Sequence, residues 1–274
     1  MRESPPDVTT LVRDLMHSGL ITCPPEISIG QAAALLARHR VHALIVAAEG
    51  GEPLGVISDT DLLAGEWLST DTEGLEVMLA MTAGELMTAP VVTIPADATA
   101  SEAAARLKTE RISRLVVVQD GRAIGIVTVS NLVANLTRAS TERRCVADVM
   151  SRGIVVCLAD TTVPAAARAM SERRSRSLIV VDANGKPLGV VTGFDLLALY
   201  EPGGATATVA DLMRPPLTIA PGASLRDAAD LMLRHEVHRL VVVDPANPDR
   251  TPLGLVSTSD IVAEMAAPGS LWQG

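Results

Sequence analysis

Four copies of a short phrase place hydroxyl and acidic side chains where they could bind a nucleoside. Each copy has a glycine, two aliphatic residues, a serine or threonine, two variable residues, and then Asp or Asn. An ionised carboxylate accepts hydrogen bonds and suits the paired hydroxyls of a ribose. The Ser or Thr can bond sugar or phosphate, a following helix N-terminus favours an anion, and glycine leaves room for close approach. The copies span residues 55–61, 125–131, 189–195 and 254–260.

The same residues also have a purely structural interpretation. Asp and Asn are preferred helix N-caps, and Ser or Thr at a strand end satisfies local backbone groups. A cap and a ligand contact do not exclude each other, so each copy is judged by how complete it is.

The four copies differ in completeness. The second keeps an acceptor in Asn131 but loses the charge, and the third has Phe194 where a small hydroxyl residue is expected. We expect Phe194 to pack in its cleft, and we expect ligand occupancy to fall in the order fourth, first, second, third. The polar residues of the three copies predicted to bind ligand are Ser58, Thr60 and Asp61, then Thr128, Ser130 and Asn131, then Ser257, Ser259 and Asp260.

The elements that position these residues repeat in step with the phrase. In the second copy, β-branched runs predict strands at 91–94, 115–118 and 124–127, and Thr99 caps a helix that ends near Glu110. A final helix begins at Asn131, so the order is β-α-β-β-α. Each unit also has an aliphatic residue followed by Met, a hydroxyl helix cap and a pair of alanines, which favour close packing of the helix. The predicted helix caps are Ser28, Thr99, Thr162 and Ser224.

Each unit resembles a cystathionine-β-synthase (CBS) domain, and two consecutive units resemble a Bateman module. The resemblance implies an α/β (α+β) fold in which paired units enclose clefts for adenosine-containing ligands. Four units in one chain are similar to the gamma subunit of AMP-activated protein kinase and imply a pseudo-symmetric disc. The predicted units are 11–66, 82–137, 145–200 and 208–266, which form modules 1–137 and 145–274.

A second position of interest lies just before the middle strand of each unit. His238 and Arg239 in the fourth unit resemble the His-Arg pair that holds phosphates in the kinase gamma subunit. Arg is suited to phosphate because its planar fork donates bidentate hydrogen bonds, although a solvated charge at the rim of a cleft is the alternative. The matching pairs are His42-Ala43, Ser113-Arg114 and Arg176-Ser177, and of these His42 and Arg114 are further candidate ligand contacts.

Composition excludes several other classes of function. With a net charge of −9 and only four aromatic residues, the chain is not expected to bind nucleic acid, and a base would have to slot between aliphatic strands. Three cysteines without CxxC spacing favour free thiols in a reducing cytoplasm. No membrane span, metal site or catalytic residue is expected; the HxxH spacings 39–42 and 235–238 each straddle a probable helix end.

We therefore expect a cytoplasmic, non-enzymatic regulatory module that binds AMP, ADP, ATP, NAD or S-adenosylmethionine and acts on an effector protein that the sequence does not identify. The competing hypothesis is a structural or protein-interaction scaffold whose clefts are largely degenerate. The chain could form a monomeric disc or a homodimer.

Overall fold

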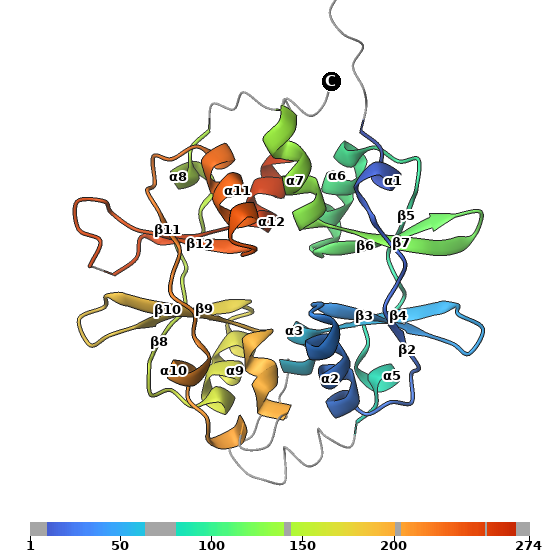
Figure 1. Ribbon diagram of the computed structural model, residues 1–274, viewed down its shortest axis with the longest axis horizontal. Coiled ribbons are helices and arrows are strands. Elements are labelled where there is room, and N and C mark those ends of the chain that lie inside the picture. The colour runs from blue at the N-terminus through green and yellow to red at the C-terminus, as the bar shows by residue number, and fades with distance from the viewer. Residues whose placement is uncertain (1–9, 64–80, 140–143, 201–203, 250, 267–274) are drawn as a thin grey trace, which may run out of the picture.

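The computed structural model describes residues 10–63, 81–139, 144–200, 204–249 and 251–266. Four similar α/β units are arranged as a flat disc around a common centre, as the resemblance implied (Figure 1). The predicted boundary at residue 66 and the outer ends of the two modules lie outside the described residues.

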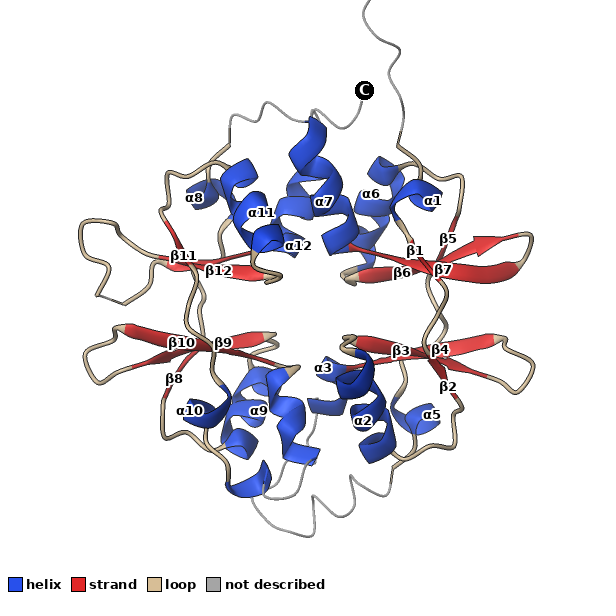
Figure 2. Cartoon of the chain, viewed as in Figure 1, coloured by secondary structure: helices blue, strands red, loops and turns tan. Residues whose placement is uncertain are grey.

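Each unit has the predicted order β-α-β-β followed by a final helix, which in unit 3 is a 3₁₀ helix (Figure 2). Unit 1 contains β2 (Thr22–Cys23), α2 (Ile29–His39), β3 (Ala43–Ala47), β4 (Pro53–Ser58) and α3 (Asp59–Leu63). Unit 2 contains β5 (Thr93–Pro95), α6 (Ala100–Glu110), β6 (Arg114–Gln119), β7 (Arg122–Thr128) and α7 (Val129–Ala139). Unit 3 contains β8 (Val156–Leu158), α9 (Val163–Glu172), β9 (Ser177–Val181), β10 (Pro187–Thr192) and the 3₁₀ helix η1 (Asp195–Tyr200). Unit 4 contains β11 (Thr218–Ile219), α11 (Leu225–Arg234), β12 (Arg239–Val242), β13 (Gly254–Ser257) and α12 (Thr258–Met265).

The middle strand is central in every sheet. It pairs in parallel with the first strand of its unit and antiparallel with the third. The repeated phrase therefore begins in the third strand and ends at the start of the following helix, beside the first residue of the middle strand. For example, β6 and β7 pair Arg114 with Thr128.

Capping follows the sequence in three of the four helices that precede a middle strand. The side chains of Ser28, Thr99 and Ser224 each accept a hydrogen bond from the amide three residues later, and the residue there returns one. Thr162 was expected to cap α9, but its side chain accepts no hydrogen bond there. Pro164 at the second helical position has no N–H to donate, and Ala165 has no polar side chain to return a bond.

Short segments cross between the two units of each module. They are α1 (Val12–Leu15), β1 (His17–Ser18), α5 (Ala83–Leu86), α8 (Val146–Val149) and α10 (Val209–Leu212). The 3₁₀ helix η2 (Gly204–Thr206) packs against α9 and η1 of unit 3. Although α1 and β1 precede unit 1, the Val12 amide bonds Ala98 at 2.8 Å and β1 joins the sheet of unit 2 beside β7. In exchange, the Ala83 amide at α5 bonds the Ile27 carbonyl of unit 1 at 2.8 Å. Units 3 and 4 exchange α8 and α10 in the same way, so the members of a module are interlocked.

These crossings explain the glycine of the repeated phrase. Val56 and Thr88 exchange backbone hydrogen bonds of 3.0 and 2.9 Å, and a Cβ on Gly55 would lie 2.9 Å from the Thr88 carbonyl oxygen. A Cβ on Gly254 would similarly lie 2.6 Å from the carbonyl oxygen of Ser151. The sequence suggested that the glycine makes room for a ligand; the structure fills that room with the crossing segment, including the Met after each aliphatic residue.

The two modules join through their helices. One core cluster contains residues of units 1 and 3, and another contains residues of units 2 and 4. Both include the paired alanines, all of which are at most 3 % exposed. A small side chain there lets the helices of two units pack closely, so these pairs serve contact between units as well as packing on the sheet.

Candidate ligand cavity between three units

All four copies of the phrase fold into the same local cap. One oxygen of the Asp or Asn side chain accepts two hydrogen bonds from the Ser or Thr that ends the strand. In unit 1, Oδ2 of Asp61 accepts from the Ser58 amide at 2.7 Å and from Ser58 Oγ at 2.6 Å. Asn131, Asp195 and Asp260 accept the same pair of bonds at 2.6 to 2.9 Å. The expected cap thus forms with its roles reversed: the helix begins directly after Ser58, Thr128 or Ser257, and the Asp or Asn lies inside it, so α7 begins at Val129 and not at Asn131. Ligand contact depends on the side-chain atom that this cap leaves, which is an oxygen in Asp and the amide nitrogen in Asn131.

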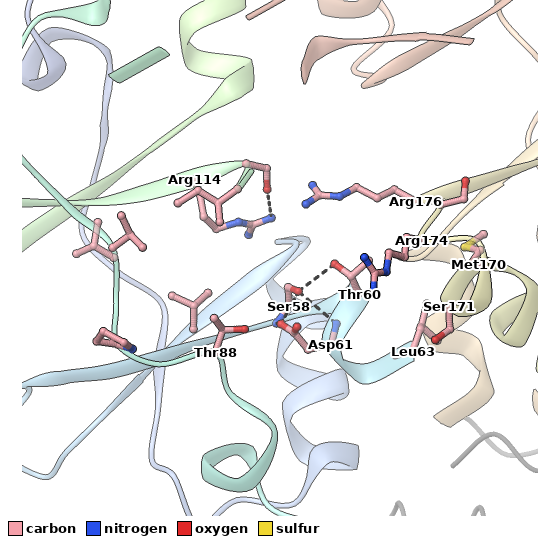
Figure 3. A pocket seen from close by; sticks show the side chains of 17 residues that line it. Ser58, Thr60, Asp61, Leu63, Thr88, Arg114, Met170, Ser171, Arg174 and Arg176 are labelled. Atoms are coloured by element: carbon pink, nitrogen blue, oxygen red, sulfur yellow. Dashed lines mark hydrogen bonds between the residues drawn. The ribbon is translucent and has the colours of Figure 1, made fainter. Parts of the chain in front are cut away.

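A cavity of about 370 Å³ lies beside the first copy, with walls from units 1, 2 and 3 (Figure 3). Its volume falls within the range of about 300–1,000 Å³ that small-molecule sites occupy. Unit 1 contributes Ser58, Thr60 and Asp61. The apolar walls are aliphatic, as expected for a chain with so few aromatic residues; they include Val56, Pro90, Val92, Ile112 and Val116.

Three arginines from two units line the same cavity. Arg114 begins β6 of unit 2, whereas Arg174 and Arg176 follow α9 of unit 3. Figure 3 shows the guanidinium groups of Arg114 and Arg176 pointing toward each other above Ser58, with Arg174 directed toward Thr60. Among the described residues, none of the three lies within 4 Å of a carboxylate. The cavity therefore carries positive charge that the described part of the protein does not pair.

Burial shifts the pKa values of Arg114 and Asp61, two charged groups of this cavity, toward their neutral forms. Desolvation lowers the pKa of Arg114, the nearby Arg176 lowers it further, and the carboxylates of Asp59 and Asp61 oppose the shift. Desolvation also raises the pKa of Asp61, against its hydrogen bonds from Ser58. Both shifts show that the charged forms are poorly solvated in the cavity. A bound ligand would compensate for this if its anionic group lay beside Arg114 and its hydroxyl groups donated hydrogen bonds to Asp61.

Side chains from all four units meet near the centre of the disc. Nδ1 of His42 lies 2.8 Å from Oδ2 of Asp59, and the His42 ring packs against Phe194 and His238 with centroid distances of 5.1 and 5.3 Å. His238 in turn lies 3.2 Å from Oγ of Ser130. His42 thus reaches the third copy of the phrase, and His238 reaches the second.

The fourth unit provides no cation triad of this kind at its own phrase. Ser257 and Asp260 form the cap, and Ser259 is exposed. Arg239 lies toward the centre, where desolvation and the charge of Arg176 lower its pKa to about 10; its Nε is buried with no hydrogen-bond partner among the described residues. Burial raises the pKa of Asp260, as it does for Asp61.

Sequence reasoning missed Arg174 as a cavity residue. It stands two residues after the end of α9 with a positive φ of 49°, a conformation that non-glycine residues rarely adopt. Aligning the repeats reveals the signal, because Arg40, Arg111 and Glu236 occupy the same place and share the positive φ. The cavity lies against unit 3, so its lining depends on contacts between modules that no single repeat encodes.

The environment of His238 predicts a pH-dependent stability. Desolvation, followed by the charges of His42, Arg239 and Arg114, lowers its pKa from 6.5 to about 4, while Asp59 opposes this. The folded protein therefore binds fewer protons than the unfolded chain between those values, so stability is complete above pH 6.5 and falls as the pH approaches 4. The full shift would correspond to about 3.4 kcal/mol, but the side chain is exposed, so we expect about 1 kcal/mol. Melting His238→Gln beside the wild type at pH 7.5 and 5 checks this: the variant should lose less stability, and parallel losses would contradict the assignment.

None of the described helices is long and apolar enough to cross a membrane. No group of three or more His, Cys, Asp or Glu side chains within the described ranges could hold a metal ion.

Comparison with known proteins places these features in a family. The family model described as "CBS domain" matches residues 12–66, 83–138, 146–201 and 209–267. The crystal structure of protein MJ1225 from Methanocaldococcus jannaschii, titled as a putative archaeal homolog of g-AMPK, superposes with a TM-score of 0.81 at 19% identity and covers 92% of this chain and 99% of that chain. At that identity the likeness shows the fold.

Two curated relatives are similar over different lengths. Protein MJ1404 of the same organism is 23% identical over 93% of this chain and 62% of its own length. The inosine-5′-monophosphate dehydrogenase of Nitrosopumilus maritimus is 35% identical over 91 residues, which are 33% of this chain and 18% of that enzyme. The chain thus covers less than two thirds of either relative. With the fourfold fold, the interlocked pairs and the match of all four units, this chain belongs to the CBS domain family.

Proposed function

We propose that this protein is a regulatory module that binds a phosphorylated adenosine nucleotide in the cavity beside the first copy of the phrase. The observation that carries the proposal is the placement of three arginines, none with a carboxylate within 4 Å among the described residues, opposite the Ser58, Thr60 and Asp61 side chains. Charged donors form the stronger hydrogen bonds to phosphate, and Arg does so with bidentate geometry. Asp61 supplies the acceptor for ribose hydroxyls, since only its Oδ2 is engaged by the described residues.

The residues that lie opposite the other three phrases make the first phrase the best candidate for nucleotide binding. Equivalent residues can be identified because the strands of the four units align. The contact of His42 with Phe194 joins units 1 and 3, and the equivalent contact of His238 with Ser130 joins units 4 and 2. At the second phrase, the residues that correspond to Arg114, Arg174 and Arg176 are Ala43, Glu236 and His238. At the third phrase they are Arg239, Arg40 and His42. At the fourth phrase they are Ser177, Arg111 and Ser113. Only the first set has three arginines, so we place the first phrase ahead of the fourth, which the sequence ranked higher.

The charge also selects among the ligands that the sequence left open. A cluster of three arginines favours ATP, ADP or NAD, which carry two or more phosphates, over AMP. It disfavours S-adenosylmethionine, because the sulfonium of that ligand would lie in a positive field. The aliphatic walls then form the slot for the base. The scaffold hypothesis retains support at the third phrase, where Arg214 bonds Oδ1 of Asp195 at 3.0 Å.

A thermal-shift panel tests the proposal. A ligand at 100 times its dissociation constant should add about 2.7 kcal/mol of stability, a rise of roughly 5 °C or more at this size. We expect ATP and ADP to raise the melting temperature more than AMP, and adenosine or S-adenosylmethionine to raise it little.

Variants of the phrase locate the site. Asp61→Ala should remove most of the ATP shift, whereas Asp195→Ala should keep it. Asp260→Ala decides between the first phrase and the fourth. The absence of a shift with every nucleotide would show that the proposal is wrong.

A further inference from the structure

The third copy of the phrase is occupied by the protein itself. Oδ2 of Asp195 accepts two hydrogen bonds from Thr192, and Oδ1 accepts one from Arg214 at 3.0 Å. The Asp195 side chain is 7 % exposed. Both carboxylate oxygens are therefore engaged, in contrast to Asp61, and the ring of Phe194 stands where the other copies have a hydroxyl residue.

Phe194 connects this cleft to the first cavity through two further residues. Its ring packs on His42 at a centroid distance of 5.1 Å, and Nδ1 of His42 lies 2.8 Å from Oδ2 of Asp59. The other oxygen of Asp59 accepts the Thr60 amide at 2.8 Å. Asp59 begins α3, the helix that also carries Thr60 and Asp61 into the cavity, so Phe194 supports the N-terminal end of that helix.

A second contact holds the other end of α3. The Tyr200 hydroxyl, at the end of η1, donates a hydrogen bond of 2.7 Å to the carbonyl oxygen of Leu62, the residue after Asp61. Between these two contacts, Gly193 lies against α3: a Cβ there would come within 3.3 Å of Leu63 and 3.8 Å of Asp59. Unit 3 thus contacts α3 near both ends of its described residues.

We propose that the third repeat is a brace for the first cavity, in which Phe194 and Tyr200 are positioning residues for Thr60 and Asp61. The inference rests on the proposed function, since it assigns these residues to the binding of the nucleotide in that cavity. The described residues of α3, Asp59–Leu63, are little more than one helical turn, so their geometry depends on tertiary contacts. Fixing it before the ligand arrives reduces the ordering cost of binding.

Two measurements on the full chain test the brace: the affinity for ATP by calorimetry, and hydrogen exchange of the amides of residues 59–63. Tyr200→Phe deletes only the hydroxyl, and Phe194→Leu deletes the aromatic contact with His42. Each should weaken ATP binding about threefold to tenfold, as for the loss of one neutral contact, and should speed exchange in 59–63. Arg214→Ala is the matched control. It opens the third cleft without touching α3, so affinity and exchange in 59–63 should stay at wild-type values.

A double-mutant cycle separates positioning from general destabilisation. In an Asp61→Ala background, Tyr200→Phe should cause a clearly smaller loss of ATP affinity, because one of the two groups that it positions is gone. An equal loss in both backgrounds would overturn the brace, as would wild-type exchange in 59–63 for both variants. Should the wild type bind no ATP, the proposed function fails, and the exchange experiment still decides whether unit 3 orders α3.

Discussion

Replacing Arg174 and Arg176 together by alanine should weaken ATP binding by more than about 100-fold. A hydrogen bond to a charged group contributes about 1.5–3 kcal/mol, which corresponds to roughly 10-fold to 150-fold in affinity for each arginine. Both side chains follow α9 and line the cavity without a carboxylate within 4 Å among the described residues. Their removal takes away donors to the phosphates while Arg114 remains, so binding is weakened but ribose contacts persist.

The control for this variant removes the same charge elsewhere. Arg38 and Arg122 are exposed and do not line the cavity, so Arg38→Ala with Arg122→Ala lowers the net charge equally. Calorimetry should show ATP affinity within about threefold of the wild type, since solvent and salt screen distant charges. Adenosine gives the second comparison, because it has no phosphate. If adenosine and ATP lost affinity equally in the Arg174→Ala/Arg176→Ala variant, the arginines would shape the cavity without contacting phosphate.

The local architecture was predictable from the sequence because it is encoded locally and four times over. The caps at Ser28 and Thr99 and the strand boundaries around Leu115 depend on neighbours within a few residues. Repetition then separates a recurring signal from chance, and the resemblance to CBS domains adds the disc. The apolar lining of the cavity followed in the same way from a composition with few aromatic residues.

The make-up of the cavity was less predictable, since it depends on which units face each other. The fourth phrase looked complete in the sequence, yet the residues opposite each phrase come from other units. His238 lies on Ser130 and not on its own phrase, and Arg176 faces the phrase of unit 1. Arg174 differs from an ordinary exposed arginine only by this placement, so a one-dimensional pattern cannot mark it.

Gly55→Ala should lower both the stability of the protein and its affinity for ATP. The new Cβ would lie 2.9 Å from the Thr88 carbonyl oxygen. The Thr88 backbone cannot move away easily, because its N–H and its carbonyl both form hydrogen bonds with Val56. Overpacking of this kind costs about 1–3 kcal/mol, which corresponds to a fall in melting temperature of roughly 4–8 °C at a cost of 2 kcal/mol. Thr88 also lines the first cavity, so a shift of its segment moves a wall of that cavity. We therefore expect ATP affinity to fall about tenfold.

Gly125→Ala is the matched variant for the other half of the module. Its Cβ would collide with the carbonyl oxygen of His17, where β1 crosses onto β7, but His17 does not line the first cavity. Melting should show a loss similar to that of Gly55→Ala, while calorimetry should show little change in ATP affinity. Gly222→Ala, with no atom within 4 Å of the new Cβ, should leave both quantities unchanged. Equal losses of affinity in Gly55→Ala and Gly125→Ala would mean that the module responds to any loosened crossing. Loss in Gly55→Ala alone would tie the nucleotide to the cavity that Thr88 and Asp61 both line.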